Sequence, residues 1–132
     1  MVKPKALLAL HDTAQARLIT MVCEEQGFDV TSVDNLEALR ARAREGDENA
    51  VIMDLNFQSW GNDCTPAREV YTKLETRYGR ERVQQMLLGI TGNPIFAKET
   101  QDEVGIQVKA KPFQLEDIEY FLQQAILESP AR

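Results

Sequence analysis

The 132-residue sequence lacks the usual features of secreted, membrane-spanning and nucleic-acid-binding proteins. Its two cysteines, Cys23 and Cys64, lie far apart and form no CxxC pair, which argues against a cysteine-based metal or redox motif. No apolar run approaches the roughly 20 residues that cross a bilayer. Lys and Arg number 15 against 21 Asp and Glu, so the net charge of -6 leaves no basic excess for phosphate backbones. We expect a reduced, cytoplasmic protein that binds neither nucleic acid nor membranes.

The composition is that of an ordinary globular domain. Hydrophobic residues make up 43% of the sequence and charged residues 27%. A chain of this length buries about two-thirds of its unfolded surface, so it folds without a disulfide or a structural metal. We expect one domain over residues 1–132, with a core of about 5–128 and no separate effector domain in this chain.

Short apolar runs alternate with amphipathic segments along the whole sequence. The runs predict five buried strands, at 6–10, 28–33, 50–55, 86–91 and 106–110. Apolar residues at helical spacing predict five helices, of which the one between the last two strands has the weakest pattern. Strict alternation with nearly continuous apolar strands predicts a parallel sheet covered on both faces. The expected fold is α/β, a flavodoxin-like doubly wound (βα)5 three-layer sandwich with strand order 2-1-3-4-5.

Residues that favour helix ends support these boundaries. Asp34 stands at the expected N-cap of the second helix, and Pro66 at the first turn of the third. Gly27 and Gly79 each follow a helical pattern, where glycine commonly ends a helix.

One predicted connection, the polar segment 56–65, is long for a loop between a strand and a helix. It contains the only tryptophan, Trp60. Two interpretations stand. The segment is a functional loop in which Trp60 covers a site, or it is a tolerated insertion in which Trp60 packs against the third helix.

Polar side chains end or follow four of the predicted strands. They are Asp12, Asp54, Thr91 and Lys111. Each one alone has a structural explanation, since Asp12 suits a helix cap and Lys111 suits a solvated surface. Ligands of open parallel sheets bind at the carboxyl ends of the strands, so placement at four such ends favours a common site.

The chemistry of this set is coherent. Two carboxylates that face one cleft repel each other unless a cation neutralises them, and Mg²⁺ prefers such oxygen ligands. The ammonium group of Lys111 and the hydroxyl of Thr91 suit the oxygens of a transferred phosphoryl group. Asp54, on the central strand, is the candidate nucleophile for formation of an acyl phosphate.

Together with the run 50–55, the pair Thr91-Gly92 and the triplet Lys111-Pro112-Phe113, these residues resemble the receiver domain of two-component response regulators. The resemblance is to the chemotaxis type, in which the receiver is a single domain. It covers essentially the whole chain, and the Lys-Pro-Phe triplet is among its more specific signals.

The resemblance implies that Asp54 accepts a phosphoryl group from a sensor histidine kinase or a histidine phosphotransfer protein, and that the domain then signals to a downstream protein. It implies a Mg²⁺ site formed by Asp12, Asp54 and the backbone carbonyl of Asn56, with Mn²⁺ as the other candidate ion. Thr91 and Lys111 are expected to bond phosphoryl oxygens. Such a domain is not a turnover enzyme, because its chemistry is limited to self-phosphorylation and autodephosphorylation.

Three features depart from the family pattern. His11 stands where the first of two adjacent acids is usual; imidazole is a poor Mg²⁺ ligand, so we expect weakened metal binding, unless His11 has no role. Val108 stands where an aromatic residue usually reports phosphorylation, which puts that switch in doubt. The loop after Asp54 is several residues longer than usual, which bears on partner choice and dephosphorylation rate.

Three other functions compete with the phosphoacceptor. A pseudo-receiver, acting as a phosphorylation-independent interaction module, is favoured by His11 and Val108. A phosphatase with an aspartate nucleophile typically carries a second acid two residues later, where this chain has Asn56. Flavin binding on this fold needs a phosphate loop rich in Ser and Thr after the first strand, and the sequence has none.

Overall fold

Five parallel strands form a sheet in the computed structural model, which describes residues 3–57, 63–111 and 113–127. The strands are β1 (Lys5–Ala9), β2 (Asp29–Ser32), β3 (Ala50–Asp54), β4 (Leu87–Thr91) and β5 (Gln107–Ala110). Their order is β2-β1-β3-β4-β5, and all four neighbouring pairs are parallel. The predicted fold class and strand order are therefore confirmed. Trp60 lies outside the described residues.

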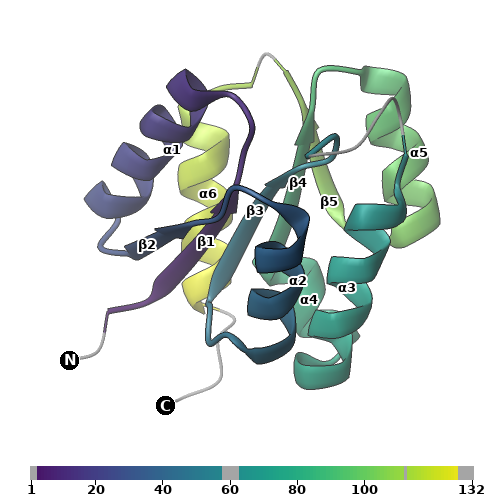
Figure 1. The fold of residues 1–132 in the computed structure, drawn as a ribbon. Helices are drawn as coiled ribbons and strands as arrows, with labels where there is room; N and C mark the ends of the chain where they lie inside the picture. The colour runs from purple at the N-terminus through teal and green to yellow at the C-terminus, as the bar shows by residue number, and fades with distance from the viewer. Residues whose placement is uncertain (1–2, 58–62, 112, 128–132) are drawn as a thin grey trace.

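Helices cover both faces of this sheet (Figure 1). The described residues form α1 (Thr13–Glu25), α2 (Leu36–Glu45), α3 (Thr65–Tyr78), α4 (Arg80–Met86), α5 (Pro94–Val104) and α6 (Leu115–Leu127). One core cluster joins one face of the sheet to α2, α3, α4 and α5, and the other joins the opposite face to α1 and α6. Alternate residues of β1 and β3 point into different clusters, which explains why both strands are apolar at nearly every position.

The structure has one helix more than the sequence predicts, because α4 lies between α3 and β4. Gly79 separates α3 from α4 with a φ of 85°, a value that favours glycine. In seven residues α4 has only two buried apolar side chains, Val83 and Met86. Such a short pattern has no recognisable helical period, and Met86 was wrongly assigned to the following strand for that reason.

The ends of two helices refine the sequence-based boundaries. Asn35, not Asp34, caps α2, since its side-chain oxygen accepts a hydrogen bond from the backbone N–H of Ala38 at 2.7 Å. The weakly predicted helix α5 has a cap at each end. Asn93 accepts from two backbone N–H groups of its first turn, and Gly105 ends it in the left-handed conformation.

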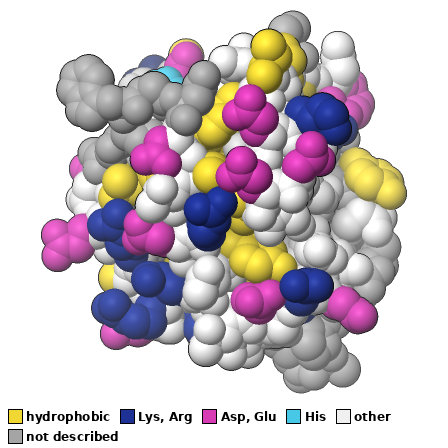
Figure 2. All heavy atoms as spheres, turned by 90° about the vertical axis from the view of Figure 1, so that its right-hand side faces the viewer, with side chains coloured by type: hydrophobic (Ala, Val, Ile, Leu, Met, Phe, Trp, Pro, Cys, Tyr) yellow, Lys and Arg dark blue, Asp and Glu magenta, His cyan; other side chains and the backbone are white. Residues whose placement is uncertain are grey.

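Charges of both signs are interspersed on the side of the molecule where α5 lies (Figure 2). Arg68 on α3 pairs with Glu103 on α5 at 3.1 Å, and Lys98 pairs with Asp102 within α5 at 3.3 Å. These pairs are exposed, so each contributes at most about 1 kcal/mol to stability. No helix in the described part of the chain is both long and apolar enough to span a membrane.

Gly89, in the middle of β4, gives a test of the packing beneath the site. A Cβ at this position would lie 2.5 Å from Cδ2 of Leu55 and 3.4 Å from Cδ1 of Ile106, both buried. We expect Gly89→Ala to lower the free energy of unfolding by roughly 1–3 kcal/mol, because overpacking forces neighbouring side chains from their rotamers. Urea denaturation followed by circular dichroism measures the change.

Gly92→Ala is the matched control for this substitution. Nothing lies within 4 Å of a Cβ placed on Gly92, so its replacement should change the free energy of unfolding by less than about 0.5 kcal/mol. Equal stabilities for Gly89→Ala and Gly92→Ala would contradict the tight contact between β4 and Leu55.

Candidate functional site

Asp54 is a nearly buried carboxylate at the carboxyl end of the central strand β3. Its side chain is 1% exposed. The backbone N–H of Asn56 donates to its Oδ1 at 3.3 Å, and its backbone carbonyl accepts from the N–H of Phe57 at 3.0 Å. The turn after β3 therefore folds back over Asp54 and supports one of its two carboxylate oxygens.

Two basic side chains approach the other oxygen. Nδ1 of His11 lies 2.7 Å from Oδ2 of Asp54, and Nζ of Lys111 lies 3.4 Å from the same atom. The imidazole comes from the loop after β1 and the ammonium from the loop after β5. A buried charge is costly without partners, and these donors provide them.

Thr91 ends β4 and is fully buried. Its hydroxyl donates to Oδ1 of Asn56 at 3.2 Å and accepts from the backbone N–H of Asn93 at 3.2 Å. The backbone N–H of Lys111 donates to the carbonyl of Thr91 at 2.7 Å, which ties the end of β5 to the end of β4. The predicted acceptor, hydroxyl and ammonium groups thus come together at one edge of the sheet.

Asp12 stands at the same edge but serves as the N-cap of α1. Its Oδ1 accepts from the backbone N–H of Gln15 at 3.0 Å, and this hydrogen bond lowers the pKa of the carboxyl group. Asp12 and Lys111 border a pocket of about 360 Å³ whose walls include Leu18 and Leu115. Its walls come from the first half of α1 and from the segment that leads from Lys111 to the start of α6.

The predicted Mg²⁺ ligands Asp12 and Asp54 are engaged with protein groups in this arrangement. Oδ2 of Asp54 is held by His11 and Lys111, and Asp12 is engaged in its helix cap. Across residues 3–57, 63–111 and 113–127 no group of three or more His, Cys, Asp or Glu side chains is placed to hold a metal ion. Mg²⁺ demands near-octahedral coordination by oxygens, and the nitrogen groups of His11 and Lys111 beside Oδ2 of Asp54 do not fit that demand.

Two contacts of the site were not predicted from the sequence. His11 was recognised as a departure from the family pattern, but its bond to Asp54 was not foreseen. The side-chain amide of Asn56, expected to contribute only its backbone carbonyl, accepts from Thr91. The signal for the first contact was available, since a residue just after β1 lies beside the end of β3 in this strand order.

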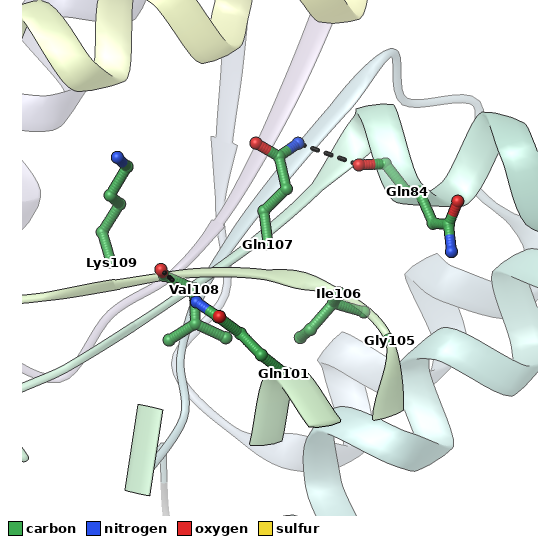
Figure 3. A pocket seen from close by; sticks show the side chains of 7 residues that line it. All are labelled: Gln84, Gln101, Gly105, Ile106, Gln107, Val108 and Lys109. Atoms are coloured by element: carbon green, nitrogen blue, oxygen red, sulfur yellow. Dashed lines mark hydrogen bonds between the residues drawn. The ribbon is translucent and has the colours of Figure 1, made fainter. Parts of the chain in front are cut away.

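A second pocket, of about 490 Å³, lies near the start of β5 and away from the acceptor (Figure 3). The side-chain amide of Gln101 donates to the carbonyl of Val108 at 2.9 Å, and that of Gln107 donates to the carbonyl of Gln84 at 2.8 Å. Lys109 is the one ionisable side chain among its described lining residues. Val108 itself is 7% exposed and packs into the core.

No protein-family model matches the sequence, and no curated protein does. Solved structures match by fold. The receiver domain of a sensor histidine kinase from Pseudomonas aeruginosa PAO1, which has a magnesium ion in its active-site cleft, is 19% identical with a TM-score of 0.74, covering 96% of this chain and 100% of that one. A response regulator receiver protein from Sinorhizobium medicae WSM419 is 18% identical with a TM-score of 0.76, covering 96% of each chain.

A chemotaxis response regulator of Vibrio cholerae is 16% identical with a TM-score of 0.70, and the match covers 94% of this chain and 99% of that one. The chain therefore has the fold of response-regulator receiver domains. At these identities the likeness establishes the fold, and the function has to be argued from the site.

Asp12 and Asn35 provide a charged and an uncharged helix cap for comparison. Because the bond from Gln15 lowers the pKa of Asp12 below its ordinary 3.8, the charged cap stabilises the fold above that pH. The contribution is lost as the pH falls through the lower pKa of the folded state. We expect the loss of stability caused by Asp12→Ala to shrink in acid.

Thermal unfolding across the acidic range measures this effect. Asn35→Ala removes a cap that does not titrate and should cost about 1 kcal/mol at every pH. A loss for Asp12→Ala that stays constant with pH would contradict a charged cap at α1.

Proposed function

We propose that this protein is a phosphoacceptor receiver. Asp54 takes a phosphoryl group from the phosphohistidine of a sensor histidine kinase or a histidine phosphotransfer protein, and the domain then signals through protein contacts. The observation that carries the proposal is the position of Lys111, whose Nζ lies 3.4 Å from Oδ2 of the buried Asp54. The hydroxyl of Thr91 stands at the same edge, on the neighbouring strand.

The proposed transfer uses groups that the chain itself provides. An oxygen of Asp54 attacks the phosphorus of the phosphohistidine, the P–N bond breaks, and its electron pair returns to the donor ring. Lys111 and Thr91 stabilise the charge on the phosphoryl oxygens. Water later attacks the phosphorus of the acyl phosphate, which releases inorganic phosphate and restores the carboxylate. No step is assigned to a divalent cation, because the present donors do not fit one.

The exposed face of α1 is the proposed docking surface for the phosphodonor protein. Leu18 and Met21 lie three residues apart on this helix and are 51% and 55% exposed. Leu18 also lines the pocket that Asp12 and Lys111 border, so the apolar face reaches two residues of the candidate site. We also propose a cytoplasmic location, because both cysteines are free. The target of the signal is proposed to be a downstream protein.

The pseudo-receiver is the second candidate, and two observations favour it. His11 already occupies an oxygen of Asp54, and Val108 is too small to act as the usual reporting aromatic residue. In this alternative the fold acts as an interaction surface and the contact between His11 and Asp54 is structural.

Phosphorylation by acetyl phosphate distinguishes the two candidates. We expect intact-protein mass spectrometry to show one added phosphoryl group on the wild type and none on Asp54→Asn, whose amide is not a nucleophile. Thr91→Ala and Lys111→Ala should each slow labelling roughly a hundredfold, because each removes a donor to the phosphoryl oxygens.

Beryllofluoride gives an independent check, with amide shifts expected around Asp54, Thr91 and Lys111 in the wild type and absent in Asp54→Ala. Labelling should be followed with and without added Mg²⁺. If the folded wild type takes up neither phosphoryl group nor beryllofluoride under either condition, the pseudo-receiver replaces the phosphoacceptor.

A further inference from the structure

His11 is the only histidine in the sequence, and it lies directly on the acceptor oxygen. Its Nδ1 is 2.7 Å from Oδ2 of Asp54, closer than Nζ of Lys111 at 3.4 Å. This is the contact distance of a close pair between an imidazole nitrogen and a carboxylate oxygen. The ring nitrogen therefore occupies the space directly beside Oδ2.

The strand pairing brings the residue at position 11 close to the end of β3. Ala9 on β1 is paired with Met53 on β3, so the residues that follow these strands meet at the same edge of the sheet. A carboxylate in place of His11 would stand beside Asp54 and near Asp12. Three acids at one edge would repel one another unless a cation bound between them. The imidazole removes one of these charges and supplies a donor instead.

The same contact obstructs a cation. A metal ion that approached Oδ2 of Asp54 would have to displace the imidazole nitrogen of His11, 2.7 Å from that oxygen, and the ammonium of Lys111. It would also compete for Asp12 with the backbone N–H of Gln15. Mg²⁺ binds oxygen ligands and gains nothing from an imidazole in exchange.

We propose that His11 occupies the position beside Oδ2 of Asp54 that a divalent cation would otherwise take. The protein therefore binds Mg²⁺ much more weakly than the same chain with a carboxylate at position 11. His11 is a positioning residue, because it acts by holding Asp54. The proposal rests on the proposed function only in treating Asp54 as the acceptor, and the contact and its effect on metal affinity can be measured without phosphoryl transfer.

Magnesium titrations followed by amide NMR test the proposal. We compare the wild type with His11→Asp, which adds an oxygen ligand, and with His11→Asn, which removes the imidazole without adding a charge. His11→Asp should bind Mg²⁺ at least about tenfold more tightly than the wild type, and His11→Asn should gain much less. Adding Asp54→Asn to His11→Asp should abolish the gain, which places the ion at the acceptor.

A second readout uses the imidazole itself. Since the chain has one histidine, its Hε1 proton gives a single resonance. Asp54→Asn should move this resonance, because it alters the partner of Nδ1. Mg²⁺ concentrations that saturate His11→Asp should leave the wild-type resonance in place. This measurement decides the question on the wild type even where a variant folds poorly.

Wild-type affinity for Mg²⁺ equal to that of His11→Asp would overturn the proposal, and so would a saturable shift of the His11 resonance at the same concentrations. Labelling by acetyl phosphate on the same samples separates this outcome from failure of the proposed function. Absence of labelling in both proteins contradicts the phosphoacceptor and leaves the affinities to decide the role of His11. If both proteins are labelled and bind Mg²⁺ with equal affinity, the result contradicts the proposed role of His11 and leaves the phosphoacceptor unaffected.

Discussion

The buried carboxylate of Asp54 is the constraint on which the site depends. A charge at the end of a central strand, with 1% of its side chain exposed, needs donors from elsewhere in the chain. The strand order supplies them, because β1 and β4 flank β3 and β5 lies beyond β4. The loops after β1 and β5 bring His11 and Lys111 to one oxygen, and the turn after β3 brings the N–H of Asn56 to the other.

Thr91 connects the surroundings of Asp54 to the other strand ends at this edge of the sheet. Through Asn56 it touches the turn after β3, and through Asn93 it touches the cap of α5. The backbone carbonyl of Thr91 accepts a hydrogen bond from the backbone N–H of Lys111. The ends of β3, β4 and β5 are therefore joined by hydrogen bonds that meet at Thr91.

The alternation of apolar runs with amphipathic segments predicts the parallel sheet and its strand order. It also predicts that Asp54, Thr91 and Lys111 lie close together, because the carboxyl ends of parallel strands meet at one edge of the sheet. The helix α4 was missed because its seven residues contain too few apolar positions to define a period. The bond between His11 and Asp54 was missed because it depends on side-chain direction, which strand pairing alone does not specify. Asp12 suited a metal ligand as well as a helix cap, and the structure shows the cap.

The side-chain amide of Gln101 affects whether another chain can pair with the edge of the sheet at β5. β5 is the last strand of the sheet, and its outer margin would otherwise offer the carbonyl of Val108 to an incoming strand. Because Gln101 of the same chain already occupies that carbonyl, strand-to-strand growth is discouraged at this margin. A partner that met this side would therefore contact side chains, whereas backbone pairing would accept almost any extended peptide.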